Sequence, residues 1–295
     1  MQNAPSRGFF AVVGGLAIAT VAFAGGVAAG RSSSEDEAGA STPSVTTAVT
    51  TPAGADDERP HVIIYGDSLV TQAEPYLTLV SPALGLEVEA RALGGTAACD
   101  FLTPLNDDLE AERADLVVWA FSGNSIGSCM VDEQGEVLTG DAVWERYRTD
   151  TTTAIEAAAE AGVPFVLASP PAPALPGDPW EQLDTVYREI AAEHSSVLYA
   201  DAGVAISPVG EFIATQRCLP FELRIPVARE ACGGGDGEIT VRGSDGHFCP
   251  EPSTTGLECP TYSSGAMRYA INLLQAARIE LDYREQIAAG YVPPA

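Results

Sequence analysis

HVIIYGDSL, residues His61 to Leu69, is the stretch of the sequence that decides the fold. Its apolar run is short, continuous and rich in β-branched residues, which is typical of a strand buried on both faces of a sheet. Gly66 permits a sharp turn directly after this strand, and α/β proteins place their sites at such strand ends. The pattern therefore predicts that Ser68 projects a nucleophilic hydroxyl from the edge of a sheet. The simpler interpretation is that Asp67 and Ser68 only cap a helix that follows the strand.

Three later segments place further polar residues after strand-like runs or in a loop. LGGT (93–96) follows the strand-like run 86–92, and FSGNS (121–125) follows the run 116–120. DGHF (245–248) lies in a loop near the C-terminal end, where functional groups are commonly carried. Serine, glycine, asparagine and histidine therefore occur in this order along the chain.

This order of motifs resembles that of the SGNH (GDSL-type) hydrolase superfamily, whose name records the four residues. The resemblance spans roughly 59–283. It implies that Ser68 is the nucleophile and that the backbone N–H groups of Ser68 and Gly95 form an oxyanion hole with the side-chain amide of Asn124. Gly94 could take the place of Gly95, because the paired glycines leave the register open by one residue.

A serine hydroxyl attacks a carbonyl efficiently only when a base removes its proton, and histidine titrates in a range that suits this task. The chain has three histidines. We interpret His61, at the start of the first strand, and His194, at a polar helix end, as structural or solvated. His247 is therefore the predicted general base, and the carboxylate of Asp245 is its predicted orienting partner.

Two departures from the family pattern affect this prediction. The family usually has the aspartate three residues before the histidine, whereas Asp245 lies two residues before His247 and Ser244 takes the third position. Either Asp245 still reaches the imidazole, which we favour, or a backbone carbonyl orients a Ser-His pair. The asparagine motif also has Ser125 where the family usually has aspartate. Both departures leave open a non-catalytic binding or scaffold protein on the same fold.

Strand-like and helix-like segments alternate over residues 61–295, which predicts one α/β domain with a mostly parallel sheet and helices on both faces. The resemblance implies a three-layer α/β/α, flavodoxin-like arrangement. The expected strands are 62–65, 86–92, 116–120, 164–168 and 196–200. The expected helices are 142–161, 180–193 and 264–281. The region 208–259 is expected to be an irregular, disulfide-braced part near the site.

The N-terminal segment predicts export. Residues 8–30 carry no charge and are long enough to span a membrane as a helix. Small-x-small sequences at 22–24 and 27–29 resemble cleavage sites, but the apolar run exceeds an ordinary signal-peptide core. We therefore interpret residues 1–30 as a signal peptide or, preferably, an anchor that contacts the membrane and leaves the domain outside the cytoplasm. Residues 31–60, rich in Ser, Thr, Pro and acidic residues, are expected to form a disordered linker.

Six cysteines support an exported location, because paired cysteines persist in oxidising compartments. Sequence alone leaves their connectivity open. We predict pairing between neighbours: Cys99 with Cys129, Cys218 with Cys232, and Cys249 with Cys259. A metal site is the alternative, but the sequence has neither a Cys-x-x-Cys spacing nor a histidine cluster. We therefore expect no metal and no cofactor.

The charge of the chain limits its partners. Its formal net charge is −26 at pH 7, which argues against nucleic acid, because binding it requires neutralisation of phosphates. The acidity also argues mildly against highly anionic substrates, although a local arginine pocket could override the average.

Together these patterns predict an exported, monomeric serine esterase or acyl hydrolase that acts on an O-acyl ester of a glycan, a lipid or a small molecule. One alternative is an O-acyltransferase of envelope glycans or lipids, in which a sugar hydroxyl replaces water. The other is the non-catalytic scaffold. The sequence does not select the acyl group or the alcohol.

Overall fold

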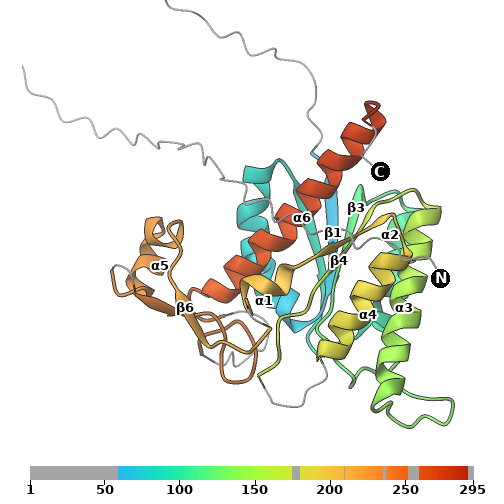
Figure 1. Cartoon of the computed structure of the whole chain (residues 1–295), viewed down its shortest axis with the longest axis horizontal. Helices are drawn as coiled ribbons and strands as arrows, with labels where there is room; N and C mark the ends of the chain where they lie inside the picture. Colours follow the sequence, from blue (N-terminus) through green and yellow to red (C-terminus); the bar gives the residue numbers. More distant parts are fainter. Residues whose placement is uncertain (1–58, 175–179, 209, 235–236, 252–258, 292–295) are drawn as a thin grey trace, which may run out of the picture. The chain divides into compact units, whose positions relative to one another are not determined.

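A five-stranded parallel sheet forms the middle layer of the folded unit (Figure 1). Its strands lie in the order β2-β1-β3-β4-β5, which is the order of flavodoxin-like folds. Their bounds are β1 His61–Gly66, β2 Glu87–Ala92, β3 Leu116–Ala120, β4 Phe165–Ala168 and β5 Val197–Ala200. The predicted mostly parallel α/β fold is therefore confirmed.

The computed structural model describes residues 59–174, 180–208, 210–234, 237–251 and 259–291. These residues belong to one compact unit, Asp56–Ala295. The predicted signal peptide or anchor and nearly all of the predicted linker lie outside the described residues. Within the described ranges, no helix is both long enough and apolar enough to cross a membrane.

Five helices cover the two faces of the sheet (Figure 1). They are α1 Ser68–Val80, α2 Leu102–Glu110, α3 Asp141–Glu160, α4 Trp180–Glu193 and α6 Ser264–Ala288, with short 3₁₀ turns at Ser81–Leu84, Ala98–Phe101 and Ala202–Ala205. The predicted helices correspond to α3, α4 and α6, but α6 continues beyond its predicted end at Leu281. The helix α1 is the one that the capping interpretation of Asp67 required, and α2 was not predicted.

The alternation of side chains along β1 explains the three layers. Val62 and Ile64 lie in an apolar core with α1 and α6, whereas Ile63 and Tyr65 lie in a second core with α2, α3 and α4. All four side chains are fully buried, because β1 lies inside the sheet with a helical layer on each face. The continuous apolar run therefore reflects the burial of β1 on both faces of the sheet, as expected for a strand inside a parallel sheet.

The region 208–259, predicted to be irregular, contains a second small sheet. Its strands β6 Thr215–Arg217 and β7 Glu238–Thr240 pair antiparallel, and the 3₁₀ turn Glu222–Arg224 and helix α5 Pro226–Ala231 lie between them in the chain. An ion pair of 2.6 Å between Arg268 on α6 and the fully buried Glu222 fastens this region to the main layer. Three-residue strands are too short for a periodic pattern to reveal, so the sequence did not predict them.

Candidate active site

Ser68 stands where β1 ends and α1 begins. A side chain on Gly66 would bring its Cβ to 2.2 Å from Val70 Cγ2 and 2.7 Å from Ala120 O, so only glycine fits at the end of the strand. Asp67 is the N-cap of α1, and its Oδ1 accepts a hydrogen bond of 3.0 Å from a backbone N–H of the first turn. The helix cap and the projecting serine are therefore both present, and the cap fixes the corner from which Ser68 faces a cavity.

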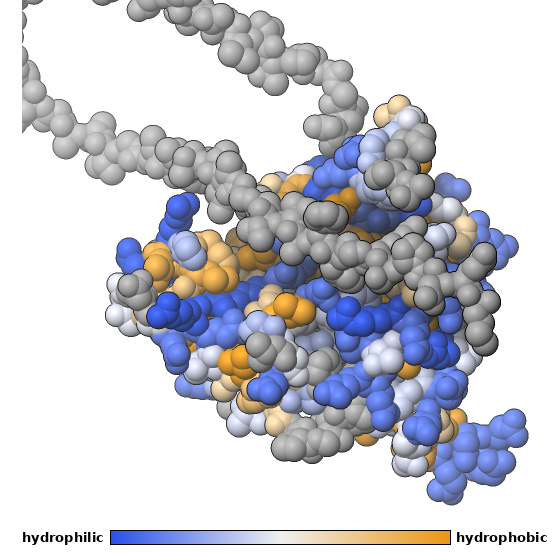
Figure 2. Space-filling view, viewed as in Figure 1, coloured by the Kyte–Doolittle hydropathy of each residue, from blue (hydrophilic) through white to orange (hydrophobic). Residues whose placement is uncertain are grey.

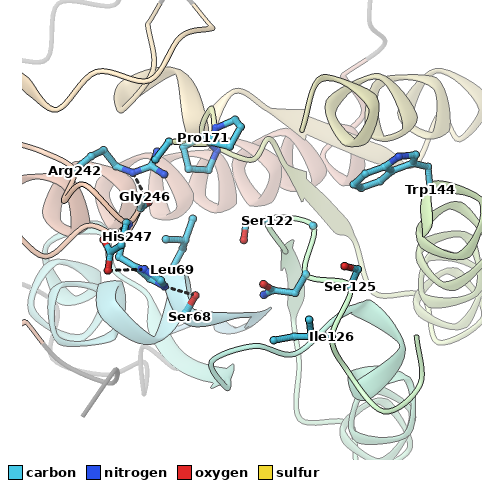
Figure 3. A pocket seen from close by; sticks show the side chains of 15 residues that line it. Ser68, Leu69, Ser122, Ser125, Ile126, Trp144, Pro171, Arg242, Gly246 and His247 are labelled. Carbon is cyan, nitrogen blue, oxygen red and sulfur yellow. Dashed lines mark hydrogen bonds and ion pairs between the residues drawn. The ribbon is translucent and has the colours of Figure 1, made fainter. Parts of the chain in front are cut away.

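His247 lies between Ser68 and Asp245. Its Nε2 is 3.1 Å from Ser68 Oγ, and its Nδ1 is 3.2 Å from Asp245 Oδ2. The backbone N–H of His247 also donates to Asp245 Oδ1 at 3.1 Å. Gly246 has a φ of +84°, so the chain turns back on itself and the shortened Asp-x-His spacing still brings the carboxylate to the imidazole. The structure thus brings together the three residues that the sequence predicted as nucleophile, base and orienting carboxylate. Figure 3 shows two of them, Ser68 and His247.

The loop that carries His247 is fastened by two groups that the sequence reasoning missed. The buried Gln72 accepts a hydrogen bond of 2.7 Å from Phe248 N, and Arg242 donates from Nε to Gly246 O at 2.5 Å. Gln72 lies one helical turn after Ser68, so the helix that presents the serine also holds the histidine loop. That i, i+4 spacing was the signal available in the sequence.

Asp67 also connects the ends of β1 and β3. Its Oδ2 accepts hydrogen bonds of 2.6 Å from both the backbone N–H and the hydroxyl of Ser122, and one of 3.2 Å from Asn124 Nδ2. Complete burial raises the pKa of Asp67, while the hydrogen bonds from Ser122 act in the opposite direction. A buried carboxylate therefore fixes the loop that carries the predicted oxyanion donor.

In this structure the side-chain amide of Asn124 donates hydrogen bonds to other groups of the protein. Nδ2 donates to Thr96 O at 3.1 Å as well as to Asp67, and Tyr147 donates from its hydroxyl to Asn124 O at 2.9 Å. Asn124 thus joins the loops after β1, β2 and β3, and it lines the cavity beside Ser68. As an oxyanion donor it would have to exchange one of these bonds for the substrate oxygen.

Of the two candidate glycines, Gly94 lies next to the serine. A Cβ on Gly94 would be 3.7 Å from Ser68 Cβ, whereas a Cβ on Gly95 would be 3.7 Å from Ile126 Cδ1. Gly95 has a φ of +81°, which explains why a glycine stands there. A Cβ would thus meet Ser68 only at Gly94, and the role of either glycine as a backbone donor stays a prediction.

A cavity of about 320 Å³ opens over these residues. Figure 3 shows Arg242, Gly246 and His247 on one side of it and Ser125, Ile126 and Trp144 on the other, with Ser68 near its floor. Its lining therefore combines polar side chains, such as those of Ser125 and His247, with apolar ones, such as those of Leu69 and Ile126. A site of this size and mixed lining suits a small or medium-sized organic group.

The three disulfides of the structure are the pairs predicted from the sequence. They join Cys99 to Cys129, Cys218 to Cys232 and Cys249 to Cys259. The first ties the segment after β2 to the segment after β3, and the third holds the chain directly after the histidine loop. Three disulfides indicate an oxidising, extracytoplasmic environment. Cys99, Asp100 and Cys129 lie close enough together to suggest a metal site, but both sulfurs are already bonded to each other.

Comparison with known proteins finds solved structures that are similar to this chain in fold. No protein-family model and no curated protein matches the chain. A lipase/acylhydrolase from Enterococcus faecalis is similar in structure, with 17% identity over 77% of this chain and 96% of that chain and a TM-score of 0.43. The C-terminal catalytic domain of peptidoglycan O-acetyltransferase A from Streptococcus pneumoniae has 17% identity over 76% of this chain and 95% of its own, with a TM-score of 0.46. An acetyl xylan esterase from Geobacillus stearothermophilus has 16% identity over 74% and 94%, also with a TM-score of 0.46.

Proposed function

We propose that the protein is an extracytoplasmic serine hydrolase that cleaves carboxylic esters through an acyl-enzyme. One observation carries the proposal: Ser68 Oγ lies 3.1 Å from His247 Nε2, and the opposite ring nitrogen lies 3.2 Å from Asp245, at the floor of an open cavity. This is the arrangement in which a base activates a serine and a carboxylate sets the tautomer of that base.

In the first half of the reaction, Ser68 Oγ attacks the carbonyl carbon of the ester while its proton passes to His247 Nε2. The resulting imidazolium is stabilised by Asp245 and then gives that proton to the alcohol oxygen, so the C–O bond breaks and the alcohol leaves. In the second half, water attacks the acyl-serine, loses a proton to His247 and displaces Ser68 Oγ, which takes the proton back. The carboxylic acid is released and the site returns to its starting state.

The negative charge that develops on the carbonyl oxygen needs donors on the side of the cavity opposite His247. Ser68 N–H is available because it belongs to the first turn of α1, a helix of 13 residues, whose dipole also favours negative charge there. Gly94 or Gly95 and the amide of Asn124 complete the proposed oxyanion hole. Each such donor commonly contributes about 3 kcal/mol to transition-state stabilisation.

The proposed location rests on two observations. All six cysteines are paired, and the segment 8–30 has the length and composition of an export signal or anchor. O-acylated glycans and lipids of the cell envelope are accordingly the proposed substrate class.

Hydrolysis of p-nitrophenyl esters from acetate to palmitate by the full-length chain, produced with its disulfides formed, tests the proposal. Ser68→Ala should abolish turnover, whereas Ser125→Ala, a serine of the same cavity, should retain most of it. Labelling with a fluorophosphonate separates the remaining outcomes. A labelled Ser68 without hydrolysis would indicate an acyltransferase, and an unlabelled Ser68 in folded protein would indicate the non-catalytic scaffold.

A further inference from the structure

Arg242 is a buried cation that forms no ion pair with any of the described residues. Its exposed fraction is 4%, and no carboxylate in the described part of the chain lies within ion-pair distance of its guanidinium. The other buried arginine on which the fold depends, Arg268, is 3% exposed and pairs with Glu222 at 2.6 Å. Burial of a charge is costly unless the charge is paired, so the contrast between the two arginines requires an explanation.

The contacts of Arg242 offset only part of that cost. Nε donates to Gly246 O, and Nη1 donates to Ala172 O at 3.0 Å. The rings of Phe212 and Phe248 lie 5.4 Å and 5.7 Å from the guanidinium carbon. Burial lowers the pKa of Arg242 to about 10, although the nearby charge of Asp245 acts in the opposite direction, so the group is still charged at neutral pH. Neither N–H of Nη2 has a hydrogen-bond partner among the described residues.

The unpaired end of the guanidinium belongs to the candidate active site. Arg242 lines the same cavity as Ser68 and His247, and Figure 3 shows it beside Gly246 on the histidine side. A Cβ on Gly246 would lie 3.3 Å from Arg242 Nη2, so this nitrogen lies against Gly246, another residue of the cavity lining. The cavity thus offers N–H groups of a desolvated cation to whatever occupies it.

The position of Arg242 indicates which part of an ester it faces. In the proposed mechanism His247 returns its proton to the alcohol oxygen, so the alcohol lies on the histidine side of the serine. The carbonyl oxygen points the other way, toward the Asn124 loop. Arg242 holds the backbone of Gly246, the residue before His247, and therefore lies on the alcohol side.

We propose that Arg242 binds a carboxylate carried by the alcohol part of the substrate, as in an O-acylated uronic acid or another acidic sugar. This proposal rests on the proposed ester hydrolysis and specifies its substrate class. A planar carboxylate accepts paired hydrogen bonds from a guanidinium, and such bonds are stronger when both groups are desolvated. The charge of Asp245, a carboxylate of the same cavity, acts on Arg242, but Asp245 contacts His247 through both of its oxygens and forms no ion pair with Arg242.

A matched pair of esters tests the proposal in the full-length, disulfide-bonded protein. The anionic ester is 4-acetoxybenzoate, and its neutral counterpart is methyl 4-acetoxybenzoate. The ratio of kcat/KM for the anionic ester to kcat/KM for the neutral ester should fall at least about tenfold in Arg242→Gln, because the variant loses the charge that binds the carboxylate. Comparing this ratio between variants cancels the different leaving-group reactivity of the two esters. Arg242→Lys, which keeps the charge without the planar fork, should retain part of the preference.

The control is Arg278→Gln, which changes the net charge equally but lies on the outer side of α6, where Arg278 pairs with Asp282 and Glu285. Its ratio should equal that of the wild type. If Arg242→Gln slows both esters equally, Arg242 only fastens the histidine loop and the proposal is wrong, while ester hydrolysis stands.

A binding measurement covers the cases in which a variant does not fold or neither ester is hydrolysed. Calorimetry on Ser68→Ala should show tighter binding of methyl glucuronoside than of methyl glucoside. If Ser68→Ala shows this preference while the wild type hydrolyses neither ester, the carboxylate site is retained and the proposed hydrolysis is rejected. Equal binding, or tighter binding of the neutral sugar, would overturn the role of Arg242.

Discussion

Two aspartates beside Ser68 lie in opposite environments. Asp67 is fully buried; its Oδ1 accepts a hydrogen bond from Leu69 N in the first turn of α1, and its Oδ2 accepts from Ser122, which follows β3. The Asp245 side chain is 48% exposed and contacts His247. The same substitution, aspartate to asparagine, should therefore affect catalysis at one position and folding at the other.

Asp245→Asn is expected to lower kcat for ester hydrolysis about 10–100-fold. This is less than the roughly 10⁴-fold loss known for a buried triad aspartate, because water already competes for the exposed carboxylate. The free energy of unfolding, measured with urea, should change by less than about 1 kcal/mol, as for other exposed pairs. An unchanged kcat would favour the alternative in which another group orients His247.

Asp67→Asn is expected to lower the free energy of unfolding by about 2–4 kcal/mol. The amide nitrogen would face the N–H and O–H groups of Ser122, so these partly buried donors would lose their acceptor inside the protein. Urea unfolding of this variant beside Asp245→Asn measures the difference. Equal stability of the two variants would contradict the role assigned to the buried carboxylate.

The raised pKa of Asp67 also predicts a pH dependence of stability. Because its pKa is higher in the folded chain than its ordinary value of 3.8, the folded chain keeps this proton to a higher pH than the unfolded chain does. The contribution of Asp67 to stability therefore falls as pH rises through the window between the two values. The difference in unfolding free energy between wild type and Asp67→Asn should change with pH in this window and level off above it.

At the scale of elements, the sequence predicted what depends on local pattern. The buried strands appear in the sequence as continuous apolar runs. Ser68, His247 and Asp245 were predicted from the chemistry of their side chains and from the order of their motifs along the chain. The second small sheet was missed because its strands are three residues long. The unpaired state of Arg242 could not be predicted, since it depends on which distant segments pack around the guanidinium. Whether Asp245 contacts His247 could not be predicted either, because this contact depends on the left-handed turn at Gly246.

The disulfides offer an element-scale test, because one of them joins two loops of the site. Replacing Cys99 and Cys129 by serine opens a loop of 30 residues and should lower the unfolding free energy by about 3–4 kcal/mol. It should also lower kcat, since the loops after β2 and β3 carry the proposed oxyanion donors. Urea unfolding and ester hydrolysis of the folded fraction measure the two effects.

Replacing Cys218 and Cys232 by serine is the matched control. This disulfide closes 14 residues in the region of the small sheet, so its loss should lower stability by about 3 kcal/mol. Neither cysteine lines the cavity, so kcat should stay close to that of the wild type. Equal losses of kcat in both pairs would mean that the first disulfide has no special role at the site.

At the scale of the whole molecule, a strongly acidic protein carries a buried cation in its candidate site. The net charge is −26, and hydrophilic residues predominate on the face drawn in Figure 2. Surface charges act over a Debye length of about 8–10 Å in physiological salt, whereas the guanidinium of Arg242, which is almost fully buried, acts at contact. A single carboxylate can therefore bind at Arg242 while a long polyanion is repelled by the net negative charge of the protein.

This balance predicts opposite sensitivities to salt for small and polymeric substrates. Raising sodium chloride from about 20 mM to about 500 mM should increase kcat/KM several-fold for an O-acetylated polyuronate, because screening removes the surface repulsion. For 4-acetoxybenzoate, whose one carboxylate contacts Arg242 inside the cavity, kcat/KM should change little or decline. The neutral methyl ester reports any direct effect of salt on the enzyme. A polymer rate that falls with added salt would show instead that positive surface around the cavity attracts the chain, and the acidic exterior would then not govern substrate choice.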